Sequence, residues 1–426
     1  MTIHVVQPGE TISSIADQYK IAVDRLIIDN GLVNPDNLAI GQTIVIIYPA
    51  ISYTVQEGDT LNDIADQYNV SVMHLLRNNP YLSNREFIYP GETIIIQYET
   101  NKLRTIETSG YAYPFIPTET LQKTLPFLTY LTVFNYRINA NGELSDIDDE
   151  NVINMAKSYQ VAPVMMVSTF SETGVGSFDI ANTILTDMSV QDKLIDNIAT
   201  TAKTKGYSGV NHTLIYLTPL NKTQMEAYVS KLGARLRSEG IVLIVTISPS
   251  INISRTEVNY DIVDLTNISQ SVDGILLLTY EWGYSFGPPA SATPVNLVEK
   301  ILQSIETIVP TSKLSMGLPV IGYDWTLPYV PGDSVANSIS SDAAVLLAYE
   351  VGAAIQFNDV AKAPYYFYTK ENRLHNVWFK DARSFEASAK VITDYNIQRT
   401  SIWNIMNYFA QLWFIFNNTF EIKKIL

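Results

Sequence analysis

Within about the first hundred residues, one pattern of apolar and polar positions occurs twice. The segment HVVQPGETISSIADQY at His4–Tyr19 returns as YTVQEGDTLNDIADQY at Tyr53–Tyr68, and each copy continues into an apolar helical stripe and an alternating β-branched segment. Side chains alternate faces along a strand and return to the same face about every 3.6 residues along a helix. Each copy therefore predicts a strand, two helices and a second strand.

Short apolar strands alternate with helical patterns through the rest of the chain, as in parallel β/α folds. A (β/α)8 TIM barrel requires eight such strands, and eight candidates begin at Gly110, Leu128, Val161, Gly209, Ile241, Asp273, Leu314 and Thr400. The connection between the seventh and eighth is too long for a loop and predicts a small α+β insertion. We expect an α/β protein with two βααβ modules at 1–48 and 52–98, and a barrel at 104–426 with its insertion at about 329–377.

The two copies resemble the LysM module, which binds N-acetylglucosamine-containing glycans such as peptidoglycan and chitin. Thr11 and Thr60 occupy the expected helix N-caps, and glycines precede them in the turns. The alternative is that these residues only turn the chain. The resemblance places a glycan groove between two loops of each copy, formed by Gly9, Glu10, Thr11, Ile12 and Asn34–Leu38 in the first and by Gly58, Asp59, Thr60, Leu61 and Tyr81–Ile88 in the second.

Residues 207–217, YSGVNHTLIYL, have the composition of a buried strand. Alternation puts Asn211, Thr213 and Ile215 on one face of it. The stretch resembles the fourth barrel strand of family 18 glycoside hydrolases, and most closely the branch with which spore-forming bacteria trim spore peptidoglycan. Asn211 agrees with that branch, but the family's aspartate falls on Thr213 and its acid/base glutamate falls on Ile215.

The resemblance implies a substrate-assisted reaction, in which the sugar's acetamido oxygen attacks the anomeric carbon. The glutamate protonates the leaving oxygen, and the aspartate holds the acetamido N–H. Ile215 cannot donate a proton, and Thr213 cannot supply the charge. General acid catalysis alone is worth about 10² to 10⁴-fold in rate. We therefore expect no intact catalytic site.

Other parts of the family site are present. The segment TYEWGY at Thr279–Tyr284 matches the family's sixth-strand motif, which places the Tyr280 hydroxyl at the acetamido carbonyl. Trp403 matches the tryptophan that stacks beneath the central sugar. We predict that the cleft is lined by Tyr280, Trp282, Tyr323, Asp324 and Trp403. The alternative is that these side chains pack in the core. Glu281 is the candidate substitute acid, although alternation places it on the opposite face from Tyr280.

The composition of the chain disfavours several classes of binding partner and cofactor. The chain has 28 Lys and Arg against 43 Asp and Glu, a net charge of −15, which disfavours nucleic acid and anionic membranes. It has no cysteine and four scattered histidines, so neither a disulfide nor a metal site is expected, and we predict no cofactor.

The start of the chain suggests where the protein acts. A folded repeat begins at once, without a basic segment and a long apolar run, so we expect synthesis without Sec-type export. Peptidoglycan binding then favours deposition on a forming spore inside the mother cell, in the cortex, coat or exosporium.

Three functions remain open. The first is a non-catalytic, glycan-binding or scaffold protein of the spore. The second is an active N-acetylglucosaminidase for cortex peptidoglycan, with a displaced acid such as Glu281. The third is a self-assembling protein that associates with itself or with other spore-layer proteins, because 17% charged residues is low for a soluble protein.

Overall fold

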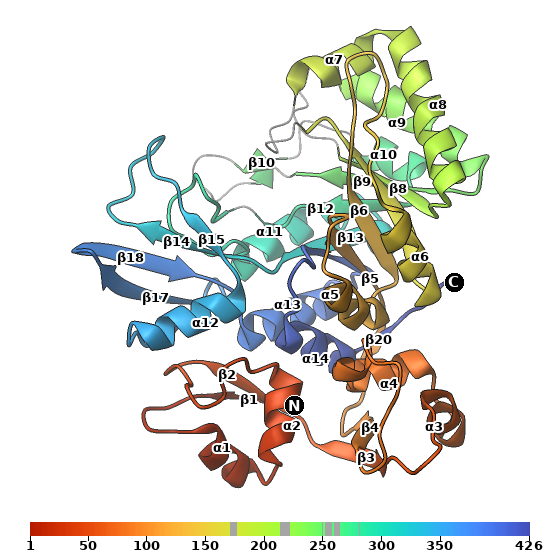
Figure 1. Cartoon of the computed structure of the whole chain (residues 1–426). Coiled ribbons are helices and arrows are strands. Elements are labelled where there is room, and N and C mark those ends of the chain that lie inside the picture. Colours follow the sequence, from red (N-terminus) through yellow and green to blue (C-terminus); the bar gives the residue numbers. More distant parts are fainter. Residues whose placement is uncertain (171–176, 214–221, 249, 252–257, 260–264, 281) are drawn as a thin grey trace.

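Two small modules lie against one side of a β/α barrel in the computed structural model (Figure 1). The structure describes all residues except 171–176, 214–221, 249, 252–257, 260–264 and 281. In Figure 1 the modules are red to orange and lie below the barrel, and the blue insertion extends to the left.

Each module has the predicted order of strand, helix, helix and strand. The first contains β1 (Thr2–Val5), α1 (Ile12–Tyr19), α2 (Val23–Asn30) and β2 (Thr43–Ile46). The second contains β3 (Pro49–Thr54), α3 (Leu61–Tyr68), α4 (Val72–Asn78), the 3-10 turn η1 (Pro80–Leu82) and β4 (Thr93–Tyr98). The two strands of each module pair antiparallel.

The helix starts follow the predicted local chemistry. Thr11 and Thr60 are the N-caps of α1 and α3, and each forms a capping box with the residue three positions later. Gly9 and Gly58 have φ values of 83° and 92°, a region that favours glycine.

A buried asparagine ties each module together. The Asn30 side-chain amide donates to the carbonyls of Leu26 and Val45, at 3.0 Å each, and its oxygen accepts from the Val45 N–H. Asn79 makes the same three bonds to α4 and β4, at 2.8 to 2.9 Å. Because buried polar groups need partners, this residue joins helix and strand in both copies.

The predicted eight-stranded barrel is confirmed. Eight parallel strands follow the order β19-β13-β12-β9-β8-β7-β6-β5, and β19 pairs with β5 to close the ring. The first strand starts at Arg104, six residues before the predicted Gly110, and the sixth ends at Leu277. The strands are β5 (Arg104–Ala112), β6 (Tyr130–Arg137), β7 (Ala162–Ser168), β8 (Gly209–Thr213), β9 (Val242–Ile247), β12 (Gly274–Leu277), β13 (Leu314–Pro319) and β19 (Arg399–Trp403).

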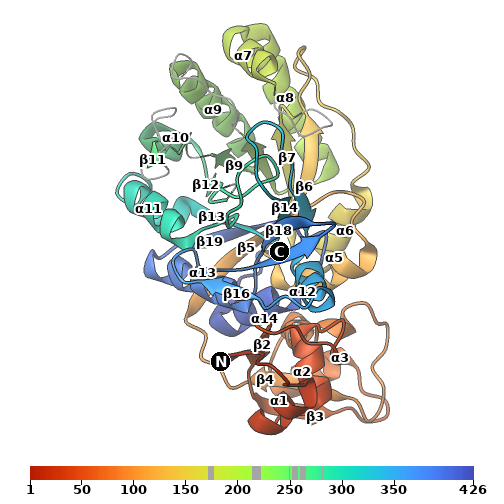
Figure 2. The ribbon, with the colours of Figure 1, turned by 90° about the vertical axis from the view of Figure 1, so that its left-hand side faces the viewer.

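Helices surround the strands (Figure 2). They are α5 (Thr118–Thr124), η2 (Leu125–Phe127), α6 (Glu150–Ser158), α7 (Phe178–Thr186), α8 (Met188–Lys205), α9 (Lys222–Arg237), α10 (Leu265–Ser271), α11 (Val295–Ile305), η4 (Thr311–Lys313), α13 (Ala382–Asp394) and α14 (Ala410–Thr419). A short ribbon pairs β10 (Ser250–Ile251) with β11 (Val258–Asn259), and β20 (Phe420–Ile422) pairs with β5. In the part of the chain that the structure describes, no helix is both long and apolar enough to cross a membrane.

An α+β insertion separates the last two barrel strands, as predicted. Its antiparallel sheet has the order β15-β14-β18-β17-β16. The elements are β14 (Gly322–Thr326), β15 (Asn337–Ile339), α12 (Ser341–Glu350), β16 (Gln356–Asn358), β17 (Ala363–Lys370) and β18 (Arg373–Trp378).

Helix α14 connects both modules to the barrel. All of its residues except Thr419 are buried, and it contacts α2 and α4 as well as α13. Gln411 donates to the Asn30 side chain and to the Thr43 carbonyl, at 3.1 and 2.6 Å. Asn417 donates to the Asn78 side chain at 2.8 Å. A largely apolar helix that is buried all round needs cover on every side, and the modules provide part of that cover beside α13.

The first module also contacts the insertion. The Ile355 N–H donates to the Ile40 carbonyl at 2.9 Å. Gly41 lies so close that a Cβ there would stand 2.1 Å from the Ile355 carbonyl oxygen, whereas a Cβ on Gly91 of the second module would meet nothing within 4 Å.

Strand β8 alternates as predicted. Asn211 points into the barrel, where it bonds Tyr111 and Thr246. His212 points outward, and its Nε2 lies 2.8 Å from the Tyr228 hydroxyl on α9. Burial lowers the pKa of His212 to about 4, so the ring is neutral at pH 7.

This burial predicts a pH-dependent stability. Between pH 6.5 and 4 the unfolded chain takes up a proton at His212 that the folded chain does not, so stability is full above pH 6.5 and falls as the pH drops. Replacing His212 by Gln should reduce the loss of unfolding free energy between pH 7 and 4.5 by about 2 to 3 kcal/mol. Guanidinium unfolding at both pH values measures this difference. Equal losses in the two proteins would contradict it.

Candidate functional site

Neutral polar groups fill the barrel interior around β8. The Tyr111 hydroxyl donates to Asn211 Oδ1 at 3.2 Å, and Asn211 Nδ2 donates to Thr246 Oγ1 at 2.9 Å. Burial raises the pKa of Tyr111, which keeps its proton at neutral pH. Both polar atoms of the Asn211 side chain are therefore occupied by hydrogen bonds inside the barrel.

Thr213 follows on the same face. Its side chain is buried, 4% exposed, and its hydroxyl has no hydrogen-bond partner among the described residues. Ile215 and Glu281 lie outside the described residues. Whatever their placement, position 213 carries a hydroxyl and position 215 a hydrocarbon, where the family resemblance requires carboxylates.

Aromatic side chains gather where the strands end. Trp403 ends β19, and its ring centre lies 5.6 Å from Tyr111 and 5.2 Å from Phe134. Tyr280 packs, partly exposed, against the same cluster. A Cβ on Gly317 would stand 2.6 Å from the Tyr280 ring, so a glycine is needed there for the tyrosine to fit. The structure thus brings together two of the predicted cleft residues, Tyr280 and Trp403.

The other three predicted cleft residues are not members of this cluster. Trp282 is 5% exposed and packs in the main hydrophobic core. Asp324 is 9% exposed and accepts hydrogen bonds from Tyr368 Oη and His375 Nδ1, at 2.7 and 3.0 Å, within the insertion. Tyr323 is partly exposed beside Trp325. Trp282 and Asp324 therefore present little surface to a ligand.

One carboxylate near the barrel axis was missed by the sequence reasoning. Glu107 lies near the start of β5, at the end opposite the predicted cleft, and lines a small cavity with Tyr111 and Asn211. Burial alone would raise the pKa of Glu107, but Lys423 at 2.8 Å and Arg399 at 2.7 Å lower it overall. Glu107 is therefore an ion-paired anion and not a proton donor.

The first loop of each module is held by an acidic side chain. Glu10 accepts a hydrogen bond from the Gln7 N–H at 2.7 Å, which is the main reason that its pKa is lowered, and lies 2.9 Å from His4 Nε2. Asp59 accepts from the Gln56 N–H and the Tyr53 hydroxyl, at 2.7 Å each. These contacts fix the loop shape beside the exposed Gly9 and Gly58.

The remaining groove residues divide between core and surface. Ile12 is buried, Leu38, Leu61, Tyr81 and Ile88 are partly buried, and Asn34 is exposed. Two exposed aromatic residues of the second module were not singled out from the sequence: Phe87 is 64% and Tyr89 59% exposed. Large apolar side chains within a polar loop were the signal that could have found them.

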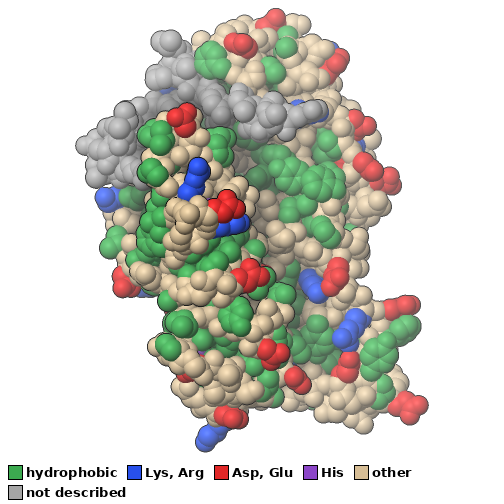
Figure 3. Space-filling model, turned by 60° about the vertical axis from the view of Figure 1, so that its left-hand side comes forward, with side chains coloured by type: hydrophobic (Ala, Val, Ile, Leu, Met, Phe, Trp, Pro, Cys, Tyr) green, Lys and Arg blue, Asp and Glu red, His purple; other side chains and the backbone are tan. Residues whose placement is uncertain are grey.

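The described residues contain no metal-ligand cluster, and one face of the molecule shows no continuous basic surface. Among them, no three His, Asp or Glu side chains converge as metal ligands would. On the face in Figure 3, the lysine and arginine side chains that are drawn stand apart and form no continuous basic surface.

Two substitutions on the barrel-facing side of β8 should affect stability differently. Thr213→Val removes an unpaired buried hydroxyl and should leave the unfolding free energy unchanged or raise it by about 1 kcal/mol. Asn211→Leu deprives two buried hydroxyls of their partner and should lower it by about 2 kcal/mol. Urea unfolding of both variants measures the difference. A loss of 1 kcal/mol or more in Thr213→Val would show that its hydroxyl does have a partner.

Comparisons with known proteins match the barrel and the two modules to known domains. Residues 94–407 match the description "Glycosyl hydrolases family 18", and residues 4–46 and 53–97 match the LysM domain. The chain is 34% identical over 431 residues to the "Cortical fragment-lytic enzyme" of Bacillus subtilis (strain 168), covering 100% of this chain and 99% of that protein.

Two solved structures share the whole arrangement. The Bacillus megaterium QM B1551 spore cortex-lytic enzyme SleL is 32% identical, with a TM-score of 0.82 and coverage of 100% of this chain and 99% of that one. The Bacillus cereus spore cortex-lytic enzyme SleL is 30% identical, with a TM-score of 0.81 and coverage of 99% and 98%. This chain belongs to glycosyl hydrolases family 18 and carries two LysM domains before its barrel.

Proposed function

We propose that this protein binds N-acetylglucosamine-containing glycans of spore peptidoglycan and that its barrel does not cleave them. The observation that carries the proposal is strand β8, which points Thr213 into the barrel two residues before Ile215. In the family pattern these two positions carry the aspartate and the acid/base glutamate. Without them, neither protonation of the leaving oxygen nor charge stabilisation of the acetamido group has a source on this strand.

The rest of the molecule supports binding. Both modules keep their capping boxes, turn glycines and loop contacts, so both groove frameworks are formed. Tyr280 and Trp403 still lie in one aromatic cluster at the carboxyl end of the strands. Aromatic faces of this kind suit the apolar face of a pyranose ring. The barrel then contributes a sugar-shaped surface and the modules provide wall attachment.

Spore association is the setting that we infer for this binding. Of the similar proteins named above, one is a cortical fragment-lytic enzyme and two are spore cortex-lytic enzymes. We place the protein in cortex, coat or exosporium, made in the mother cell. Fractionation of spores with an antibody against this chain tests the location.

A paired assay tests binding without cleavage. The purified protein should sediment with insoluble peptidoglycan and release no reducing ends from cortex fragments or N-acetylglucosamine oligomers. The cortical fragment-lytic enzyme of Bacillus subtilis is the control for an assay able to detect release. Release at a comparable rate by this protein would end the non-catalytic proposal, and failure to sediment would end the binding proposal.

An active N-acetylglucosaminidase is the second candidate, and the names of the similar proteins favour it. It requires an acid elsewhere, for which Glu281 beside Tyr280 is the candidate. If release is detected, Glu281→Gln should lower the rate by at least about 10²-fold, since general acid catalysis contributes that much. An unchanged rate in Glu281→Gln would remove this candidate.

A further inference from the structure

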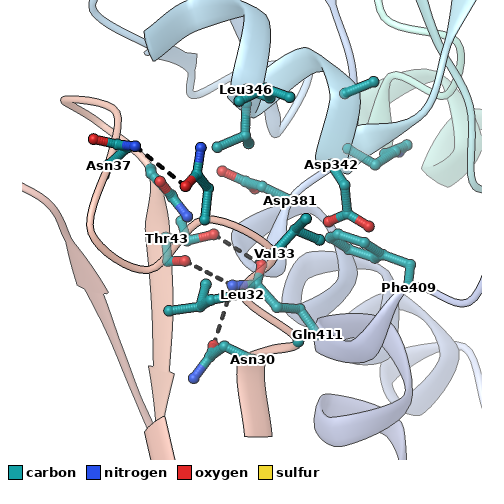
Figure 4. Close-up of a pocket in the computed structure, with 16 residues that line it drawn as sticks. Asn30, Leu32, Val33, Asn37, Thr43, Asp342, Leu346, Asp381, Phe409 and Gln411 are labelled. Carbon is teal, nitrogen blue, oxygen red and sulfur yellow. Dashed lines mark hydrogen bonds between the residues drawn. The ribbon is translucent and has the colours of Figure 1, made fainter. Parts of the chain in front are cut away.

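A hollow of about 280 Å³ lies between the first module and the barrel domain (Figure 4). The module contributes the loop after α2, including Val33 and Asn34. Helix α12 of the insertion contributes Asp342 and Leu346, and Phe409 lies at the start of α14. The hollow is separate from the loop Gly9–Ile12, which does not line it. It exists only because the module is docked on the barrel.

The back wall of the hollow is formed by hydrogen-bonded side chains. Gln411 donates to Asn30 and to the Thr43 carbonyl, and the Thr43 hydroxyl donates to Gln411 Oε1 at 3.0 Å (Figure 4). These three side chains are buried, and their polar atoms bond to one another or to main-chain groups of the module. On the rim, the Tyr349 hydroxyl of α12 donates to Asn37 Oδ1 at 2.7 Å. The walls are thus already in place for a ligand.

Three polar groups remain open toward the hollow. Asn34 Oδ1 accepts from Asn37, and Gln42 Oε1 accepts from the Ala39 N–H, so each amide nitrogen is left to donate. Among the described residues, neither nitrogen nor the Asp342 carboxylate has a hydrogen-bond partner. The site therefore offers two neutral donors and one acceptor.

Apolar side chains complete the wall. Val33 is 81% exposed and Leu346 37% exposed, and both line the hollow together with Leu32 and Phe409. A sugar hydroxyl can donate to a carboxylate and accept from an amide N–H, while the apolar ring face and an acetamido methyl pack on aliphatic or aromatic groups. The volume is close to the lower end of ligand sites, roughly 300 Å³, which suits about one sugar residue.

A second hollow of about 310 Å³ continues the first. The two share Gly31, Val33 and Asp342, and the second extends to Tyr81 of the second module along Tyr408 of the barrel domain. Asp342 thus lies at the junction of a furrow that runs from one module to the other. The furrow can hold a chain of sugars.

We propose that this furrow is a glycan-binding site formed jointly by both LysM modules, α12 and α14, and that it takes consecutive N-acetylglucosamine-type sugars. The site rests on the proposed function, since it binds the same class of glycan. Asp342 accepts hydrogen bonds from sugar hydroxyls, and Leu346 packs against the ring or the acetamido methyl. Neither module alone contains the complete site.

Isothermal titration calorimetry with the N-acetylglucosamine pentasaccharide tests the site in the full-length protein. Asp342→Asn keeps the shape but weakens the acceptor, and Leu346→Arg fills the hollow. Each should weaken binding at least fivefold. The matched controls Glu350→Gln and Val351→Arg change exposed residues at the end of α12 that do not line either hollow, and should bind like the wild type.

The outcomes separate the two proposals. Wild-type binding that Asp342→Asn and Leu346→Arg both leave unchanged would overturn the furrow site and keep the proposed function. A wild type that binds no pentasaccharide and no peptidoglycan would overturn both. Thermal unfolding of all four variants identifies any loss that comes from misfolding, and Asp342→Asn, an isosteric change at the surface, decides the case if Leu346→Arg is unstable.

Discussion

The burial of α14 on every side is the constraint on which the arrangement of this protein depends. Its apolar residues pack on α13 and the barrel, and its amides Gln411 and Asn417 bond the two modules. Removing the modules would expose apolar side chains of α14 to water and would remove the module partners of both amides. The modules therefore belong to the folded body of the barrel domain and are not mobile attachments.

Because the modules are held in place, the gain in glycan affinity from several sites depends on the distances between those sites. Flexibly linked sites gain affinity only as far as the linker allows both to be occupied at once. Here the distances between the module loops, the furrow and the aromatic cluster around Trp403 are set by the fold. Under the proposed function, a stiff glycan strand must match these distances, so the arrangement would select for strand geometry as well as for sugar type. This selection does not require any catalytic group.

Local periodicity was sufficient to predict the eight strands, the module order, the N-caps Thr11 and Thr60 and the alternation along β8. It could not predict the docking of the modules, because the contacts of Gln411 with Asn30 and Thr43 join residues about 370 to 380 positions apart. For the same reason the furrow was not foreseen. Asp324 was predicted in the cleft from its place at the end of the predicted seventh strand, but its partners Tyr368 and His375 come from strands whose pairing the sequence does not reveal.

The close contact at Gly41 limits which module can occupy the first position in this chain. It presses against the Ile355 carbonyl, while its counterpart Gly91 faces open space. The two modules still repeat one another in sequence, yet only the first carries a surface shaped to the insertion. Exchanging them, or grafting in a module from another protein, would place a mismatched surface against a rigid neighbour. The two modules are thus alike in sequence but not interchangeable at this contact.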